Sequence, residues 1–263
     1  MTRRRWIADE FSHDRAALTG THAAHLSRTL RARVGQEFEV ACGDQVRQAT
    51  IASVTDHRVE FALGDEIPAT ADVPITLLLA IFKFDRMEWA IEKCTELNVT
   101  TIIPVIARRS EKHLAITAKK RVERWRRIAR EASEQSRRVS PPEIAVPTKL
   151  KDALGPLHEL GILDSVVIPT DGFSPSGGIC GPPRSGLRIV LAESEREMQL
   201  SDVLRSWPQM ASLALAIGPE GGWTGDELQS FASSQWIAAS LGDTILRAET
   251  AAIAALAIAR AEL

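Results

Sequence analysis

Cysteine is scarce in this 263-residue chain, and tyrosine is absent. The three cysteines, Cys42, Cys94 and Cys180, are odd in number, and no pair has the spacing of a CxxC redox motif or a zinc knuckle. This pattern argues against a disulfide framework and predicts a reducing compartment, so we expect a cytoplasmic protein. The six histidines form no HxH or HExxH motif and no Cys/His cluster, which predicts that the protein holds no metal.

Long apolar runs are also missing. No segment approaches the roughly 18 uninterrupted apolar residues that a membrane-spanning helix needs. The basic N-terminus is not followed by the apolar stretch of a secretory signal. The sequence also lacks a Gly-x-Ser-x-Gly elbow, which argues against a serine hydrolase of that type. We therefore expect neither a membrane partner nor that hydrolytic chemistry.

The formal net charge of −2 conceals an uneven distribution of charge. Residues 1–150 contain 25 Lys and Arg against 20 Asp and Glu, a balance of +5, and 19 of these bases are arginine. Residues 151–263 contain 7 bases against 14 acids, a balance of −7. Because the planar guanidinium group matches the geometry of phosphate, the first part of the chain is the part expected to contact nucleic acid.

Positive charge is most concentrated in residues 108–138, which contain twelve Lys and Arg against four acids. We expect Thr117 to begin a long helix that reaches about Arg138, with its bases opposite the apolar face. A charged helix face is usually only solvated, but this excess is typical of a surface that binds a phosphate backbone. Including basic residues elsewhere in the first part of the chain, the candidate RNA-binding residues are Arg28, Arg31, Lys83, Arg86, Arg124, Arg127 and Arg138.

Hydrophobic periodicity divides the chain into two predicted domains. In residues 1–72, short alternating strands after a short helix predict a small β-barrel. In residues 73–263, continuous apolar runs alternate with helical segments, which predicts an α/β domain with a parallel sheet covered on both faces. The predicted elements are strands at 36–42, 46–54, 59–63, 75–82, 99–107, 166–169, 187–192, 211–217 and 237–241, helices at 25–31, 85–97, 117–138, from 225 and from 249, a linker at 66–74 and a Gly/Pro-rich loop at 171–186.

A glycine-rich turn at residues 217–222 joins one predicted strand to a helix. Thr224 and Glu227 have the spacing of a capping box, which predicts the start of that helix. The turn matches neither the Walker A motif nor the GxGxxG fingerprint. Two interpretations remain open: a purely structural turn, or a loop that binds a ligand at the carboxyl end of a parallel strand.

A second loop, residues 241–250, leads from the next strand into the last helix. Glu249 and Thr250 lie near the start of this helix, where an acid or a hydroxyl complements the helix dipole, so both have a structural explanation. Arg247 is almost the only base in this part of the chain. It is therefore a candidate functional residue, with a solvated surface arginine as the alternative.

Together these loops resemble the ribosomal RNA small subunit methyltransferase E family, whose members methylate N3 of a uridine in 16S rRNA with S-adenosyl-L-methionine. The similarity rests on 217–222, Leu241-Gly242 and 245–251, and it extends to 83–97, 134–144, His25, Arg28, Leu30 and Arg31. The sequence departs from the family pattern at Phe84, where glycine is usual, and at residues 160–186, which look like an insertion.

The resemblance implies a PUA-like β-barrel in residues 1–72 and, in residues 73–263, a SPOUT methyltransferase domain. That domain has an α/β fold with a parallel sheet and a C-terminal trefoil knot. It further implies S-adenosyl-L-methionine as cofactor, 16S rRNA of the small ribosomal subunit as partner, and a homodimer. In such a fold, backbone groups hold most of the cofactor. The implied cofactor-binding residues are Leu191, Ala192, Glu193, Ile217, Gly218, Pro219, Glu220, Gly221, Gly222, Leu241, Gly242, Ile245 and Leu246.

The implied reaction is an attack by uridine N3 on the methyl group of the cofactor. Arg247 is expected to stabilise charge on a uracil oxygen, with Glu249 or Thr250 orienting its guanidinium. The uridine must be flipped or single-stranded, because N3 is buried in a base pair. Two other functions remain open: an RNA-binding ribosome-assembly factor on the same scaffold, and a SPOUT methyltransferase acting on a different RNA base. The undamaged glycine-rich turn favours an enzyme.

Overall fold

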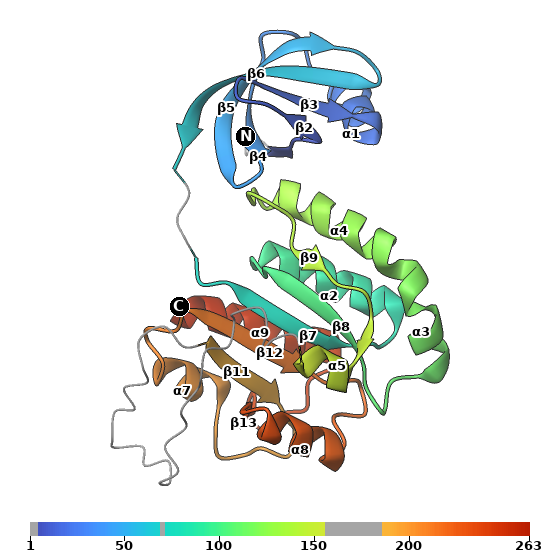
Figure 1. Ribbon diagram of the computed structural model, residues 1–263, viewed down its shortest axis with the longest axis vertical. Helices are drawn as coiled ribbons and strands as arrows, with labels where there is room; N and C mark the ends of the chain where they lie inside the picture. The colour runs from blue at the N-terminus through green and yellow to red at the C-terminus, as the bar shows by residue number, and fades with distance from the viewer. Residues whose placement is uncertain (1–4, 69–71, 156–185) are drawn as a thin grey trace. The chain divides into compact units, whose positions relative to one another are not determined.

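The computed structural model describes residues 5–68, 72–155 and 186–263 (Figure 1). The chain forms two compact units: unit 1 comprises Met1–Ala71 and Arg130–Pro141, and unit 2 comprises Asp72–Ala129 and Pro142–Leu263. Residues 130–141 therefore group with the N-terminal unit, which the sequence periodicity does not reveal. Cys180, the predicted strand 166–169 and residues 171–185 of the predicted Gly/Pro-rich loop lie outside the described residues.

Unit 1 is built on a curled, 6-stranded sheet with the order β1-β4-β5-β6-β3-β2 (Figure 1). Its pairs are antiparallel except for β1 and β4. The strands predicted from the alternating pattern are confirmed. Their alternating apolar residues, such as Val40, Ile51 and Phe61, are buried in one core. The strands are β1 Trp6–Ile7, β2 Glu10–Phe11, β3 Arg15–Thr19, β4 Glu37–Cys42, β5 Gln45–Val54 and β6 Arg58–Ile67.

The helix of unit 1 begins earlier than the sequence predicts. Helix α1 spans Gly20–Ala24, and a π-helical turn, His25–Thr29, continues it. Ala23 and Leu26 are both fully buried, so the apolar face starts upstream of the predicted range. Arg31 then adopts a positive φ of 51°, which ends the helical segment.

Unit 2 contains a parallel, 7-stranded sheet with the order β10-β8-β7-β12-β11-β13, in which β9 also pairs with β8. All residues of β7 and β12 are buried, as expected for central strands covered on both faces. The parallel sheet predicted from the apolar runs is thus confirmed. The strands are β7 Ile75–Ala80, β8 Thr101–Ile106, β9 Glu143–Ile144, β10 Thr148–Lys149, β11 Gly186–Leu191, β12 Ser212–Ile217 and β13 Ile237–Ala239.

Helices cover both faces of this sheet. Leu77 and Leu79 of β7 pack in one core with α2, α4, α7 and α9, while Leu78 and Ala80 pack in a second core with α5 and α8. Successive residues of a strand point to opposite faces, so one apolar run serves both cores. The helices are α2 Phe84–Glu96, α3 Lys112–Thr117, α4 Val122–Gln135, α5 Leu150–Leu154, α7 Leu200–Arg205, α8 Gly225–Ser233 and α9 Ala248–Glu262.

The long basic helix predicted from Thr117 is interrupted. A 3-10 segment, η2 (Ala118–Arg121), separates α3 from α4. The Thr117 hydroxyl donates to the carbonyl of His113 at 2.8 Å, so it does not cap a helix that begins there. Leu114 and Ala118 are buried, which shows that the apolar face extends upstream of the predicted start and brings the first helical turn to Lys112.

Cys42 and Cys94 are free, buried thiols. Burial raises the pKa of both groups, so they stay protonated at neutral pH. No helix within the described ranges is long and apolar enough to cross a membrane. In the same ranges, no group of three His, Cys, Asp or Glu residues is arranged to hold a metal ion.

Candidate functional site

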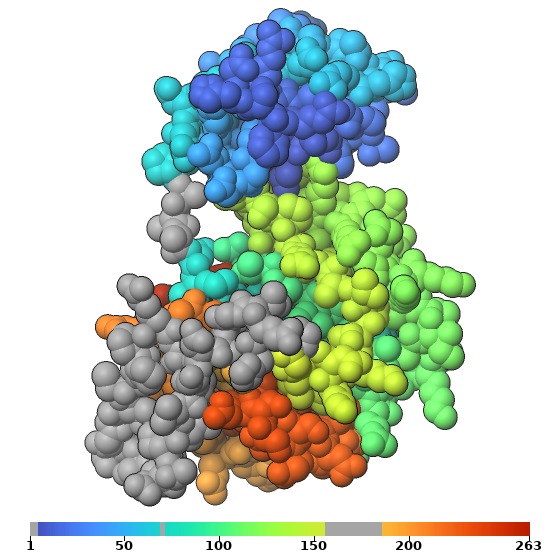
Figure 2. Space-filling model, in the orientation of Figure 1, coloured from blue at the N-terminus to red at the C-terminus, as the bar shows by residue number. Residues whose placement is uncertain are grey.

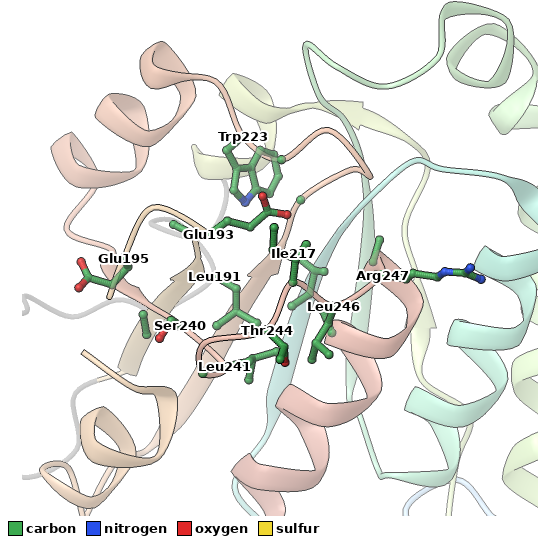
Figure 3. Close-up of a pocket in the computed structure, with 18 of the residues that line it drawn as sticks. Leu191, Glu193, Glu195, Ile217, Trp223, Ser240, Leu241, Thr244, Leu246 and Arg247 are labelled. Atoms are coloured by element: carbon green, nitrogen blue, oxygen red, sulfur yellow. The ribbon is translucent and has the colours of Figure 1, made fainter. Parts of the chain in front are cut away.

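A pocket of about 480 Å³ lies in unit 2, at the carboxyl ends of three neighbouring parallel strands (Figure 3). Its walls come from the loops that follow β11, β12 and β13. Leu191, Ile217, Leu241 and Leu246 supply an apolar interior. A volume in this range and an apolar interior are typical of small-molecule sites, and the edge is where open α/β sheets bind ligands.

The pocket gathers both loops that the sequence singles out. Twelve of the thirteen predicted cofactor-binding residues line it, and Arg247 lines it as well. Gly221 is the exception: its carbonyl accepts a hydrogen bond from Arg109, and a Cβ at this position would lie 3.3 Å from Cδ of Arg109. The lining residues not predicted from the sequence are Glu195, Arg196, Gln199, Trp223, Ala239, Ser240, Asp243, Thr244, Ala248 and Ala251.

The glycine-rich turn takes its shape from backbone geometry and from Trp223. Gly222 has a φ of +68°, and its N–H donates to the carbonyl of Pro219 at 2.8 Å. A Cβ on Gly218 would come within 3.2 Å of Nε1 of Trp223, so this close approach favours glycine. The indole is 7% exposed, and its N–H has no hydrogen-bond partner in the described parts of the chain. The turn therefore presents an unsatisfied donor beside the pocket.

Glu227 anchors the turn from the helix that follows it. The predicted capping box is confirmed: the Thr224 side chain accepts from the backbone N–H of Glu227, and the Glu227 carboxylate accepts from that of Thr224. The other carboxylate oxygen of Glu227 accepts from the backbone N–H of Arg108 at 2.8 Å. One buried carboxylate thus joins the turn after β12 to the loop after β8.

Arg86, predicted as an RNA contact, forms ion pairs within unit 2. Its Nη1 lies 3.1 Å from Oε1 of Glu220 in the glycine-rich turn, and its Nε lies 3.7 Å from Oε1 of Glu249 in the first turn of α9. Arg86 therefore links the glycine-rich turn, which lines the pocket, to the start of α9. Helix α2 supplies the residue, because β7 ends just before it at the same edge of the sheet.

Glu249 occupies a different environment from the one expected. Glu249 is 5% exposed and its carboxylate faces Arg86, and no hydrogen bond or ion pair joins it to Arg247 among the residues that the structure describes. The partner of Glu249 in the structure is thus Arg86, and an orienting role of Glu249 or Thr250 toward Arg247 stays a prediction. Oε2 of Glu249 has no hydrogen-bond partner in this part of the chain. Thr250 is exposed and does not line the pocket.

Arg247 is the residue immediately before α9, with an extended ψ of 152°. It is exposed and makes no ion pair within the described chain. Figure 3 shows its side chain directed away from Leu191 and Leu241, with Glu195 at the opposite end of the pocket. The pocket therefore has one end marked by an unpaired arginine and another marked by an acid.

The other predicted RNA contacts differ in how far their charge is already balanced. In unit 2, Lys83 and Arg127 are exposed and make no ion pair within the described residues, whereas Nε of Arg124 lies 2.7 Å from Oε1 of Glu88. In unit 1, Arg28 pairs with Asp56 at 2.8 Å on the surface, and Arg31 is exposed. Nε of Arg138 donates to the carbonyl of Ser140 at 3.1 Å.

Comparison with known proteins assigns the chain to a family. A family model described as an RNA methyltransferase domain matches residues 69–260. Ribosomal RNA small subunit methyltransferase E of Rickettsia conorii is 30% identical over 250 residues, covering 92% of this chain and 88% of the relative. The chain belongs to the ribosomal RNA small subunit methyltransferase E family. The member from Bacillus subtilis is 29% identical over 245 residues, covering 91% of this chain and 87% of its own.

A solved structure of the same family shares the whole fold. It is the methyltransferase E of Neisseria gonorrhoeae bound to S-adenosyl methionine, with a TM-score of 0.76 and 27% identity over 97% of this chain and 95% of that one.

Phe84, which stands where the resemblance led us to expect glycine, packs edge-on against Trp125 with ring centroids 6.0 Å apart. Arg121 lies over the Phe84 ring at 5.0 Å. In this family member the phenyl ring therefore fills space between α2 and α4.

Proposed function

We propose that this protein transfers the methyl group of S-adenosyl-L-methionine to N3 of a uridine in 16S rRNA of the small ribosomal subunit. The observation that carries the proposal is the pocket itself, which brings the two family loops together at one edge of the parallel sheet. The names of the Rickettsia and Bacillus relatives give the substrate class, and the Neisseria structure gives the cofactor. The proposed substrate places the reaction in the cytoplasm.

The residues of the pocket fit S-adenosyl-L-methionine. Gly242 has a φ of +112°, and the position of its absent Cβ is open space, so the backbone itself lines the pocket. Leu191, Ile217 and Leu241 offer apolar contact to an adenine ring. Four acids, Glu193, Glu195, Glu220 and Asp243, line the pocket against two arginines, which suits a ligand with a sulfonium and an ammonium group.

When bound, the cofactor supplies an electrophilic methyl group. The chain's own contribution is to orient the uridine and to stabilise the negative charge that develops on the base as N3 loses its proton. Arg247 suits this task because it is unpaired, lies at the pocket and offers a fork of donors to a uracil oxygen. Arg86 holds Glu220 and Glu249, and through them it fixes the turn and the start of α9 next to Arg247.

The finer description of the fold belongs to the same proposal. We infer a SPOUT domain whose C-terminal segments form a trefoil knot, a PUA-like barrel in unit 1, and a homodimer. Two observations support the knot and the barrel, while the homodimer rests on the family resemblance alone. The loops after β11 and β13 run together through a parallel bridge between Gln199 and Ser240, and the sheet of unit 1 is curled (Figure 1).

The test is methyl transfer from labelled S-adenosyl-L-methionine to small subunits purified from a strain that lacks this gene. We expect one methyl group per subunit, and mass spectrometry of the digested 16S rRNA should identify it as 3-methyluridine. Calorimetry with the cofactor separates the alternatives. An RNA-binding assembly factor would bind subunits without binding S-adenosyl-L-methionine, and a methyltransferase for a different base would transfer the label to another nucleotide.

A further inference from the structure

Five bases between residues 108 and 127 of unit 2 carry charge that the fold does not balance. We call them the basic rim: Arg108, Lys112, Lys119, Lys120 and Arg127. All five side chains are exposed, and none has a hydrogen-bond or ion-pair partner among the residues that the structure describes. Their neighbours on the same segment differ, because Arg124 and Arg126 pair with Glu88 and Glu123 at 2.7 Å. The excess of charge predicted from the sequence is therefore concentrated on particular residues.

The basic rim begins at the same edge of the sheet as the pocket. Strands β8 and β12 are both parallel to β7, so their carboxyl ends meet at one edge, and the rim starts with Arg108 just beyond β8. Two hydrogen bonds connect this start to the glycine-rich turn and to the helix after it: Arg109 donates to the carbonyl of Gly221 in the turn, and the backbone N–H of Arg108 donates to Glu227 of α8. The start of the rim is therefore tied to the turn that lines the pocket.

The shape and composition of the rim suit a backbone rather than a base. Figure 2 shows the green atoms of the α3 segment projecting from the surface of unit 2. Three of the five rim residues are lysines, which act as flexible point charges without the directional fork of arginine. Contacts to phosphate position a nucleic acid without reading its sequence. Ile116, 79% exposed between Lys112 and Lys119, adds an apolar contact within the charged surface.

We propose that the basic rim binds the phosphate backbone of the substrate RNA next to the target uridine and leads that strand to the pocket. This inference rests on the proposed function and adds to it the surface that binds the RNA. It differs from the prediction made from the sequence, in which Arg124 is a contact. The pairing of Arg124 with Glu88 shifts the expected contacts to the unpaired lysines of η2.

The test is the salt dependence of binding to a full-length 16S rRNA transcript, measured by filter binding between 50 and 400 mM KCl. We expect the double variant Lys119→Gln/Lys120→Gln to reduce the slope of log K against log[KCl] by about 1.5, since each phosphate contact contributes about 0.7–0.9. At 50 mM KCl its Kd should rise roughly tenfold or more.

The matched control is Lys93→Gln/Arg205→Gln, which removes the same amount of charge. Lys93 and Arg205 lie near the carboxyl ends of α2 and α7, at the opposite edge of the sheet, and both are paired with acids. We expect this variant to keep the wild-type slope. Equal losses in both double variants would show a general effect of net charge and would overturn the proposal.

Two further outcomes would also overturn it. One is an unchanged slope for Lys119→Gln/Lys120→Gln. The other is normal binding of the free transcript with weakened binding of whole subunits, which would assign the rim to a ribosomal protein. Failure of the proposed function can be distinguished from failure of this proposal. If the wild-type protein transfers no methyl group, the salt dependence of RNA binding can still be compared between the wild-type protein and the two double variants.

Discussion

Basic side chains at the two edges of the parallel sheet in unit 2 differ in whether their donors are bonded to the protein itself. At the amino edge, the guanidinium of Arg260 donates to the carbonyls of Leu97, Val73 and Asn98, and burial lowers its pKa. At the carboxyl edge, Arg247 and the basic rim make no such bonds within the described residues. The donors of Arg260 are therefore used by the fold, whereas those of Arg247 and the basic rim are available to a ligand.

The backbone follows the same division. The positive-φ glycines Gly222 and Gly242 and the unsatisfied indole N–H of Trp223 all belong to the carboxyl edge. Asn98, with a φ of +62°, marks the amino edge, where it ends α2 and its carbonyl accepts from Arg260. We therefore expect substitutions at the amino edge to change stability, and those at the carboxyl edge to change binding and turnover.

Arg247→Ala should give the largest effect on activity. Removing the guanidinium leaves charge on the uracil oxygen unstabilised, so we expect kcat/KM for methyl transfer to fall about 100-fold or more. The free energy of unfolding should change by less than about 0.5 kcal/mol, because the side chain is exposed and unpaired within the described chain. Turnover at the wild-type rate, with normal binding of cofactor and RNA, would remove Arg247 from the mechanism.

Arg260→Ala should give the largest effect on stability. It leaves three backbone carbonyls without their donor, so urea denaturation should show a loss of about 2–4 kcal/mol in the free energy of unfolding. The Kd for S-adenosyl-L-methionine, measured on the folded protein, should stay the same. Arg205→Ala is the control, since its pair with Glu262 is exposed and should contribute far less. Equal losses in the free energy of unfolding for both variants would contradict a stabilising role for the three bonds from Arg260 to backbone carbonyls.

Arg86→Ala should change binding at the carboxyl edge, because Arg86 joins the glycine-rich turn to the start of α9. We expect the Kd for S-adenosyl-L-methionine to rise roughly tenfold, which corresponds to about 1.4 kcal/mol, because Glu220 and Glu249 lose their shared partner. Arg86→Lys keeps the charge and should recover part of the affinity. If calorimetry shows wild-type affinity for the alanine variant, the bridge does not shape the pocket.

Gly242→Ala should show the smallest effect of the four. The φ of +112° is strained for any L side chain, so we expect a loss of about 1 kcal/mol in stability and a slight weakening of cofactor binding. Gly225→Ala is the matched control, because Gly225 is helical and the position of its Cβ is open. That variant should be neutral or slightly stabilising. Thermal unfolding of both variants tests the difference.

The sequence predicts those parts of the fold that depend on local patterns. Continuous apolar runs identify β7 and β12 because both faces of these strands are covered, and the Thr224–Glu227 spacing identifies the start of α8. The two pocket loops are recognisable because glycines at 218, 222 and 242 mark them. Their meeting at one edge follows from the parallel sheet.

Long-range pairings could not be predicted in this way. The bond from Arg86 to Glu220 joins residues that no periodicity connects, and Glu249 looks like an ordinary acid at a helix start until Arg86 is seen beside it. The loop after β11 is a similar case: it carries Glu195 and Gln199 into the pocket without any glycine signal. The break at η2 was missed because the basic residues continue across it.

The double role of Glu227 has a consequence for local unfolding. Its two carboxylate oxygens hold the backbone N–H groups of Arg108 and Thr224, which stand on separate loops. An opening that frees one of these amides withdraws the carboxylate from the other, so the two loops form one cooperative unit. In hydrogen exchange, the amides of Arg108 and Thr224 should therefore exchange at matching rates, and a cofactor that closes the pocket should slow both together.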